Sequence, residues 1–520
     1  MTLTIGTIGS SPGWEELLRQ EGVPFGPVVV GEAETNAFST IVVCRAPLKE
    51  ELAFIREYLR SGGALLGCST YLRDIVSLEE ESRQIAYLTP DGDGDIPGLS
   101  LIDVEATGTI AREANCFRTT DHLNAVFVGE LLGGLAVVPP FDPGRGMEDY
   151  RAAERYFYAK PERLPSERVS RVAKGELLHF CHASLEYLHH ARDLPYARLA
   201  HFPGDAGNVF ALRIDTDGAP ERELNELYAL SRSEDIPFTW FIDVAGNEAS
   251  LGLFESLERQ EIGLHCYAHR IFLDASLDAQ NIDRGARILR ERGLSAKSFA
   301  APYGFWSPDL GRIIDAAGFT YSSEFAWAYD TVPHFPVTSQ QRYGTLQIPI
   351  HPVSIGSLRK AGYGARQMTQ YFQDVVSRKI ARHEPLIFYH HPGHREWGVV
   401  RALCDGARQA GARLLTLGEY ASWWKERLAV RPLIDLKGGS LVTRCDGPSL
   451  GPGPTEISLE VSRKKGERAL AVLGSSTSLD ALLWKKVPVY SAPSDIARMR
   501  EFDLRGEIGR QFTRLQRRFP

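Results

Sequence analysis

The stretch that decides the fold of this chain is Phe210-Ala-Leu-Arg-Ile-Asp-Thr-Asp-Gly218. It reads as a short apolar strand that ends in two carboxylates. Side chains alternate across a strand, so Asp215 and Asp217 point to the same side. Two carboxylates at the mouth of a buried strand are costly unless a positive group lies between them. We therefore expect a cation at this strand end.

Histidines that can complete such a site follow at two places in the chain. His265 and His269, in His-Cys-Tyr-Ala-His, are four residues apart, so on a helix or tight helical turn both imidazoles can reach one ion. The second place is His390-His391-Pro-Gly-His394, directly after the apolar run Leu386–Tyr389. The combination predicts a single divalent-metal site with an acid–base pair beside it, used for hydrolysis.

Length and composition narrow the class of protein. A chain of 520 residues is too long for one core, so two to four domains are expected. The net charge is -7 and no long basic run occurs, which argues against a nucleic-acid partner. The seven cysteines are an odd number without CxxC spacing, so they indicate neither a disulfide framework nor a thiolate zinc site.

The first residues, Met1-Thr-Leu-Thr-Ile-Gly6, do not combine a basic segment with a long apolar one, as a signal peptide does. We also find no apolar run long enough to span a bilayer. We therefore expect a cytoplasmic location and no transmembrane segment. An oligomer is compatible with the sequence.

Residues 1–200 are predicted to form one α/β domain. Strand and helix patterns alternate over residues 2–75, which predicts parallel strands with crossover helices. This part resembles the flavodoxin-like layer of class I glutamine-amidotransferase relatives. Cys68 follows the strand Ala64–Leu66, where such a fold places a thiol nucleophile, but the partner motif His-x-Glu is missing. A small buried residue is therefore the favoured interpretation. Further along, Lys174–Phe180 is predicted to form a turn and a strand.

Two further domains are expected. Residues 205–428 repeat strand–helix units with polar residues at the strand ends, which is typical of a β/α barrel. Residues 429–520 change to alternating apolar patterns around the Gly/Pro-rich segment 447–454, which predicts a small antiparallel β domain. Its last twenty residues, with Arg510, Arg514, Arg517 and Arg518, read as a basic surface helix.

The Asp-x-Asp, His-x-x-x-His and His-His-Pro motifs together resemble those of the polysaccharide deacetylase family, also called the NodB homology domain or carbohydrate esterase family four. The phrases Ile236-Pro-Phe-Thr-Trp-Phe-Ile-Asp243 and Leu417-Gly-Glu-Tyr-Ala-Ser-Trp-Trp-Lys425 add to the resemblance, which runs from Phe210 to about Leu428. It implies a distorted β/α barrel. It also implies a hydrolase that uses one divalent metal to remove acyl groups, mostly acetyl, from amino sugars.

The resemblance also implies a role for each motif residue. Asp215 would be the general base, Asp217, His265 and His269 the metal ligands, and His391 the general acid, with His390 as the alternative acid. The third motif usually begins with an arginine that orients the base, and here Ala300 stands in its place. The residues expected to contact substrate are Pro302, Tyr303, Glu324, Trp327, His390 and His394.

Two nitrogen ligands and one oxygen suit zinc, although cobalt, nickel or iron could occupy such a site. The leading hypothesis is therefore a metal-dependent deacetylase acting on an amino sugar, a polysaccharide or its precursor. One alternative is a hydrolase of a small amide, formamide or cyclic amide with the same fold. Another is a saccharide-binding scaffold without catalysis.

Overall fold

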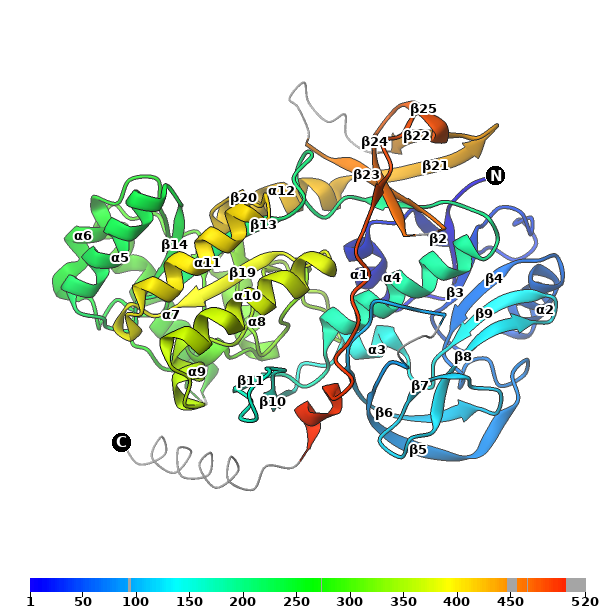
Figure 1. The fold of residues 1–520 in the computed structure, drawn as a ribbon, viewed down its shortest axis with the longest axis horizontal. Coiled ribbons are helices and arrows are strands. Elements are labelled where there is room, and N and C mark those ends of the chain that lie inside the picture. The colour runs from blue at the N-terminus through cyan, green and yellow to red at the C-terminus, as the bar shows by residue number, and fades with distance from the viewer. Residues whose placement is uncertain (92–94, 273, 447–455, 465, 502–520) are drawn as a thin grey trace.

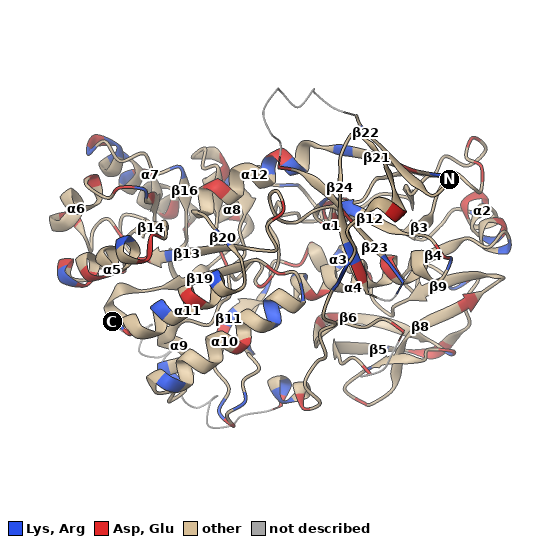
Figure 2. Ribbon diagram, turned by 45° about the horizontal axis from the view of Figure 1, so that its top comes forward, with Lys and Arg blue, Asp and Glu red and all other residues tan. Residues whose placement is uncertain are grey.

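The computed structural model describes residues 1–91, 95–272, 274–446, 456–464 and 466–501. Strands and helices alternate through most of the chain, so the fold is mixed α/β, as predicted. Figure 1 shows an N-terminal unit, coloured blue to cyan, beside a central unit, coloured green to yellow. Figure 2 shows that basic and acidic residues are mixed over both units. Within the described residues, no helix combines the length and the apolar character that crossing a membrane requires.

The N-terminal unit is built on a seven-stranded sheet in the order β2-β1-β3-β4-β9-β8-β7. Its first five strands run parallel, as the strand–helix alternation of residues 2–75 predicts. β8 then pairs antiparallel with β9, and β7 antiparallel with β8, which the sequence pattern did not indicate. The strands are β1 (Ile5–Ile8), β2 (Phe25–Pro27), β3 (Thr40–Val43), β4 (Ala64–Gly67), β7 (Cys116–Arg118), β8 (Asn124–Leu131) and β9 (Gly134–Val138).

Helices and two hairpins surround this sheet. The hairpins pair β5 (Leu78–Leu88) with β6 (Ile102–Ala111) and β10 (Ala152–Tyr156) with β11 (Ser166–Ser170). The helices are α1 (Pro12–Glu21), α2 (Lys49–Arg60), α3 (Pro143–Met147) and α4 (Lys174–His190). The strand predicted at Lys174–Phe180 is wrong, because these residues open α4. Along α4, apolar side chains recur every three or four residues, and those on this face are buried: Leu177, Cys181, Leu185 and Leu188.

α1 and α3 approach each other closely at Gly13, where an added Cβ would lie 1.9 Å from the carbonyl oxygen of Gly144. Backbone atoms cannot move aside cheaply, so Gly13→Ala is expected to lower the free energy of unfolding by about 1–3 kcal/mol. Urea titration would measure this change. Gly26→Ala in β2 is the matched control, because a Cβ there meets nothing within 4 Å. Equal stability of the two variants would contradict the close contact.

The central unit is a curled sheet in the order β18-β17-β16-β15-β14-β13-β19, with β20 also paired to β13. All its strand pairs are parallel, and the backbone N–H of His351 donates to Ile387 of β19 across the open side. This is the distorted, open β/α barrel expected for residues 205–428. Its strands are β13 (Val209–Asp215), β14 (Phe238–Ile242), β15 (Glu261–Leu264), β16 (Ser298–Phe299), β17 (Tyr321–Ser322), β18 (Leu346–Gln347), β19 (Leu386–His390) and β20 (Arg413–Leu414).

Helices cover the outside of this sheet (Figure 1). They are α5 (Glu221–Glu234), α6 (Leu251–Glu255), α7 (Ala275–Glu291), α8 (Pro308–Ala316), α9 (Ile355–Lys360), α10 (Ala365–Ala381), α11 (Trp397–Gln409) and α12 (Leu417–Ala429). Because the strands are parallel and separated by these helices, their carboxyl ends meet at one edge of the sheet, which is where the motif residues follow.

The C-terminal residues form antiparallel strands, as predicted, but one of their two sheets also includes a strand from an earlier part of the chain. β21 (Arg431–Lys437), β22 (Ser440–Asp446) and β25 (Ser476–Ser478) form one sheet. β23 (Ser458–Arg463), β24 (Glu467–Val472) and β26 (Lys485–Lys486) extend from β12 (Tyr196–Leu199), which precedes the segment 205–428.

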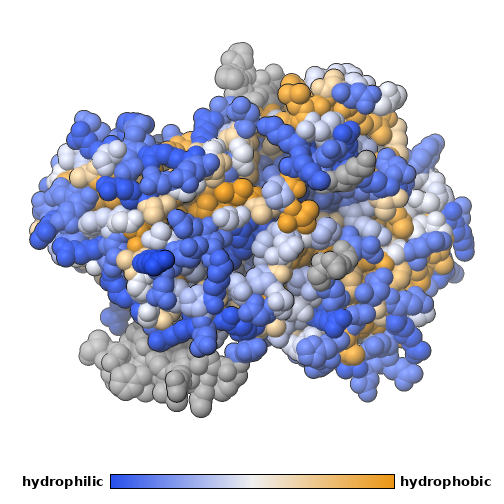
Figure 3. Space-filling model, in the orientation of Figure 1, coloured by the Kyte–Doolittle hydropathy of each residue, from blue (hydrophilic) through white to orange (hydrophobic). Residues whose placement is uncertain are grey.

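Several apolar side chains of this C-terminal part are exposed, including Val472, Leu483 and Val489. Figure 3 shows apolar surface at the upper right, where Figure 1 places β21, β22 and β25. The loop 447–454 and the basic helix predicted at the C-terminus lie outside the described residues.

Candidate metal centre

Three parallel strands deliver the predicted site residues to one edge of the central sheet. Asp215 ends β13, and Asp217 follows in a turn with a φ of 44°, in the left-handed region. His265 comes directly after β15, and His391 directly after β19. Since β13 lies in the sheet path between β14 and β19, with β15 beyond β14, residues far apart in the sequence meet here.

The side chains of Asp217, His265 and His269 converge on one point. Asp217 Oδ1 lies 3.2 Å from His265 Nε2 and 3.3 Å from His269 Nε2. One ligand atom of each residue lies within 4.8 Å of the others. Two imidazole nitrogens and one carboxylate oxygen form the donor set of a catalytic zinc-type site, which leaves further coordination positions open.

The hydrogen bonding of His265 fits a bound cation. Its Nδ1 lies 2.6 Å from the carbonyl oxygen of Ala300, which can only accept, so Nδ1 carries the proton. In the neutral ring, the Nε2 lone pair then faces the Asp217 carboxylate, an arrangement that calls for a positive charge between them. Burial opposes ionisation of Asp217, yet the neighbouring histidines His265, His391 and His269 hold the pKa of this carboxyl below its usual range.

Arg213 is a site residue that sequence reasoning missed. Its Nε donates to Asp215 Oδ1 at 2.6 Å and its Nη2 to Oδ2 at 2.7 Å, while Nη1 donates to the carbonyl oxygen of Ser323. Burial opposes the charge on Asp215, but the guanidinium of Arg213, together with His265 and His391, lowers the pKa of Asp215. The arginine expected at position 300 is thus supplied from β13. Its position two residues before Asp215 was the available signal, because it puts both side chains on one face of the strand.

The two neighbouring histidines at the end of β19, His390 and His391, point in different directions, as strand alternation requires. His391 faces the site, with Nε2 3.3 Å from Asp217 Oδ2. His390 is buried against Trp397, with ring centroids 5.7 Å apart, and neither of its ring nitrogens has a hydrogen-bond partner among the described residues. The geometry therefore favours His391 over His390 as a group that can reach a substrate at this edge.

Two of the residues predicted to contact substrate lie at the rim of the site. Tyr303 is 53% exposed, follows the buried Pro302, and has its ring centroid 5.0 Å from that of His269. The His394 ring lies 4.9 Å from that of His391. Substrate contact by these side chains stays a prediction.

Glu324 and Trp327 lie behind the site rather than at its open face, because both side chains are fully buried. Glu324 accepts from the backbone N–H of Ala301 and from the Gln347 amide, so it supports the loop that carries Ala300. Trp327 donates to a ring nitrogen of His334. Both residues follow the short strand β17, where the chain folds inward, and this structure gives neither a surface on which substrate could bind.

Cys68, the other candidate for chemistry, is buried directly after β4 in the N-terminal unit. Burial raises the pKa of its thiol, so the reactive thiolate is disfavoured. This environment agrees with the favoured interpretation of a small buried residue.

No protein-family model and no curated protein matches this chain. Puue allantoinase is 15% identical, covers 44% of this chain and 93% of its own, and gives a TM-score of 0.37. A polysaccharide deacetylase from Bacillus cereus is 16% identical, with 40% and 91% covered and a TM-score of 0.31. The peptidoglycan deacetylase PdaC from Bacillus subtilis is 14% identical, with 43% and 95% covered and a TM-score of 0.30. These TM-scores are low, and the similarities carry no argument for the function of this chain.

Proposed function

We propose that this chain is a metal-dependent hydrolase that removes the acyl group, most often acetyl, from an N-acylated amino sugar. One observation carries the proposal: Asp217, His265 and His269 converge at a sheet edge where Asp215 and His391 lie beside them. Three ligands, an ionised carboxylate and a further imidazole are the groups that hydrolysis of an amide requires.

Asp217, His265 and His269 would hold the metal, which when bound lowers the pKa of a water and polarises the acyl oxygen. Asp215 is kept ionised and oriented by Arg213, so it can take the proton from the attacking water. His391 in its protonated form gives a proton to the leaving nitrogen as the C–N bond breaks. Burial lowers the pKa of His391, which makes the protonated ring a stronger acid. The products are a carboxylate and a free amine.

The experiment that tests this proposal combines metal content with acetate release. The wild type is expected to contain about one metal ion per chain and to release acetate from short N-acetylglucosamine or N-acetylgalactosamine oligomers. His265→Ala should lose the metal, because Nε2 of His265 is one of the three donors. His122→Ala removes an exposed histidine of the N-terminal unit and should change neither readout.

Two outcomes would contradict the proposal at different levels. Metal without acetate release from either oligomer would overturn the amino-sugar substrate and point to a small amide or formamide. Failure of the wild type to bind metal, even after zinc or cobalt is added, would overturn the hydrolase itself.

A further inference from the structure

A cavity with charged residues in its wall lies at the opposite edge of the central sheet from the candidate metal centre. Arg382, His383 and Glu384 line it and precede β19, whereas His391 follows that strand. The cavity holds about 420 Å³ and is also lined by α4, by the turn between β23 and β24, and by residues 487–490. All three parts of the chain therefore contribute to it. Of the chain's 14 histidines, five line the cavity: His179, His182, His190, His201 and His383.

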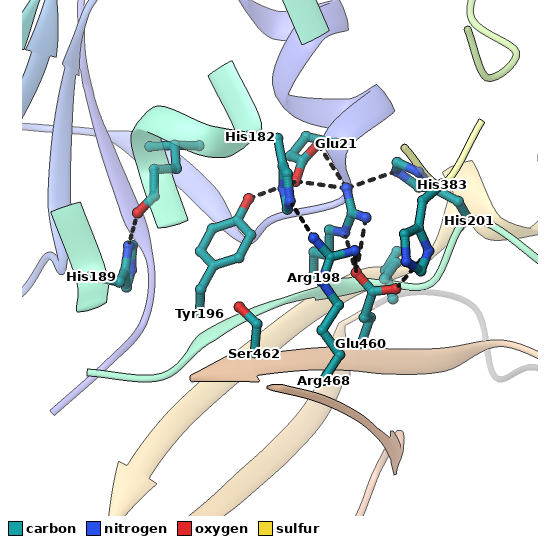
Figure 4. Close-up of polar contacts among 12 residues, drawn as sticks. Glu21, His182, His189, Tyr196, Arg198, His201, His383, Glu460, Ser462 and Arg468 are labelled. Atoms are coloured by element: carbon teal, nitrogen blue, oxygen red, sulfur yellow. Dashed lines mark hydrogen bonds and ion pairs between the residues drawn. The ribbon is translucent and has the colours of Figure 1, made fainter. Parts of the chain in front are cut away.

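Two of the carboxylates around this cavity already have several donors each. Glu21 accepts from His182 Nδ1 at 2.8 Å, from the Tyr196 hydroxyl at 2.7 Å and from Arg198 Nη1 at 3.0 Å (Figure 4). Glu460 accepts from Nε and Nη2 of Arg198 at 3.1 and 2.9 Å.

Glu384 is engaged in the same way on the other wall of the cavity. It accepts from His179 Nε2 at 3.0 Å, from Arg382 Nε at 2.7 Å and from Lys379 Nζ at 3.3 Å. The lone pairs of these acids are therefore largely in use, and little acceptor capacity is left for the remaining cations.

The guanidinium groups at the cavity pair with carboxylates, but some of their N–H groups do not. His182 Nδ1 faces the Glu21 carboxylate and so carries a proton, which leaves Nε2 to accept from Arg468 Nη2 at 3.3 Å (Figure 4). Arg198 Nη1 likewise lies 3.4 Å from Nε2 of His201. Two arginines thus donate to neutral imidazoles. Arg382 Nη1 is buried and has no hydrogen-bond partner within the described ranges.

Burial and neighbouring charges also keep one of the cavity histidines neutral. Burial and then the charge of Arg468 lower the pKa of His383 to about 3, so its ring is neutral. Below the cavity, Arg427 is fully buried and donates to the backbone carbonyls of Ala200, Leu199 and Glu21, with no ion pair to a carboxylate among the described residues. Arg382 Nη1 and Arg468 Nη2 are therefore donors without a carboxylate acceptor among the described residues, while carboxylates such as Glu186 also line the cavity.

We propose that this cavity binds a small organic anion whose carboxylate or phosphate oxygens accept hydrogen bonds from Arg382, Arg468 and the cavity histidines. Charge-assisted bonds from guanidinium to such oxygens are the strong class of hydrogen bond. The volume exceeds what a bare phosphate fills, and the wall at Leu99, Pro488, Val489 and Tyr490 gives apolar surface for the rest of the molecule. The Arg382 guanidinium lies 4.9 Å from the Tyr490 ring centroid, so the charged donor and the apolar surface are next to each other.

Calorimetric titration of the full chain tests this proposal with inorganic phosphate, glucose 6-phosphate and citrate, at ionic strength matched with potassium chloride. At least one anion is expected to bind saturably at millimolar concentration and to raise Tm. Stronger binding of glucose 6-phosphate than of phosphate would assign the site to a phosphorylated sugar, and stronger binding of citrate to a carboxylate ligand.

Two variants test whether the anion binds in the cavity. Arg468→Gln is expected to weaken binding about tenfold, because one charge-assisted hydrogen bond is lost. Arg401→Gln is the matched control, since Arg401 is an exposed residue of α11 paired with Glu234. The affinity of this variant for the anion should equal that of the wild type. If Arg468→Gln does not fold, His383→Asn replaces it, because asparagine tolerates the φ of 54° at this position.

The absence of saturable binding of all three anions to the wild type would overturn the proposal. So would an affinity in Arg468→Gln, or in its substitute His383→Asn, equal to that of Arg401→Gln, because the anion would then bind elsewhere.

Discussion

The Asp215→Asn variant is expected to keep its metal and to lose most of its activity, with kcat/KM for acetate release lower by about 10²–10⁴-fold. The amide has almost the shape of the carboxylate but cannot take a proton from water. Asp215 is not among the three converging donors, and both its oxygens face Arg213. Metal content should therefore stay at the wild-type level, while the proton-accepting step is lost.

Metal analysis and steady-state kinetics on the same preparations would check this result. Asp309→Asn, which changes an exposed acid in the first turn of α8, is the control and should behave as the wild type. Full activity in Asp215→Asn would show that another group accepts the proton. Loss of metal in this variant would show that Asp215 is a ligand rather than a base.

The sequence predicted that Asp217, His265 and His269 come together because the signal for this cluster is local. Asp215 and Asp217 lie within one strand end, and His265 and His269 within one turn, so alternation and spacing alone place their side chains. Parallel strands then bring the carboxyl ends of β13, β15 and β19 to the same edge, whatever the length of chain between them. No knowledge of side-chain packing is needed for either step.

The sequence reasoning missed Arg213, although the pattern that places this residue was available. The alternation that puts Asp215 beside Asp217 also puts Arg213 beside Asp215. The resemblance directed attention to position 300 as the source of an arginine, and Ala300 stands there. Glu324 and Trp327 differ in kind, because their burial depends on how the chain after β17 packs against Gln347 and His334, and no local pattern encodes that packing.

The strand predicted at residues 174–180 was wrong, and the prediction for residues 429–520 did not include one strand pairing. Both features depend on residues outside the segments from which the predictions were made. A short apolar run reads equally well as a strand or as part of a buried helix, and only the full length of α4 distinguishes them. The pairing of β12 with β23 joins Arg198 to Glu460, residues 262 positions apart. Strand pairing at such a separation leaves no periodic signal in either segment, so this pairing could not be predicted from the sequence.

The Arg213→Met variant is expected to lose both stability and activity, because methionine fills part of the space of arginine but leaves Asp215 buried without its partner. Removing one member of a buried ion pair typically lowers the free energy of unfolding by about 3–5 kcal/mol. The pKa of Asp215, lowered in the folded wild type, would rise through burial alone. The acid limb of the kcat/KM profile should therefore move to higher pH.

The pH dependence of stability separates this electrostatic effect from a simple packing defect. A carboxyl whose pKa is lowered in the folded state stabilises the protein above its ordinary value, here 3.8, and this contribution disappears as pH falls through the lower folded value. The stability deficit of Arg213→Met should therefore be largest near neutral pH and shrink as the pH falls below that ordinary value. Urea titrations at neutral and acidic pH would measure it.

Arg213→Lys provides the matched comparison, because it keeps a positive charge but cannot donate to both oxygens of Asp215 in the same plane. If charge alone matters, lysine restores the acid limb of the profile and most of the stability. If orientation of the base matters as well, kcat stays low in Arg213→Lys although the acid limb returns. A stability deficit of Arg213→Met that does not change with pH, together with an unmoved pH profile, would show that Arg213 only fills space beside Asp215.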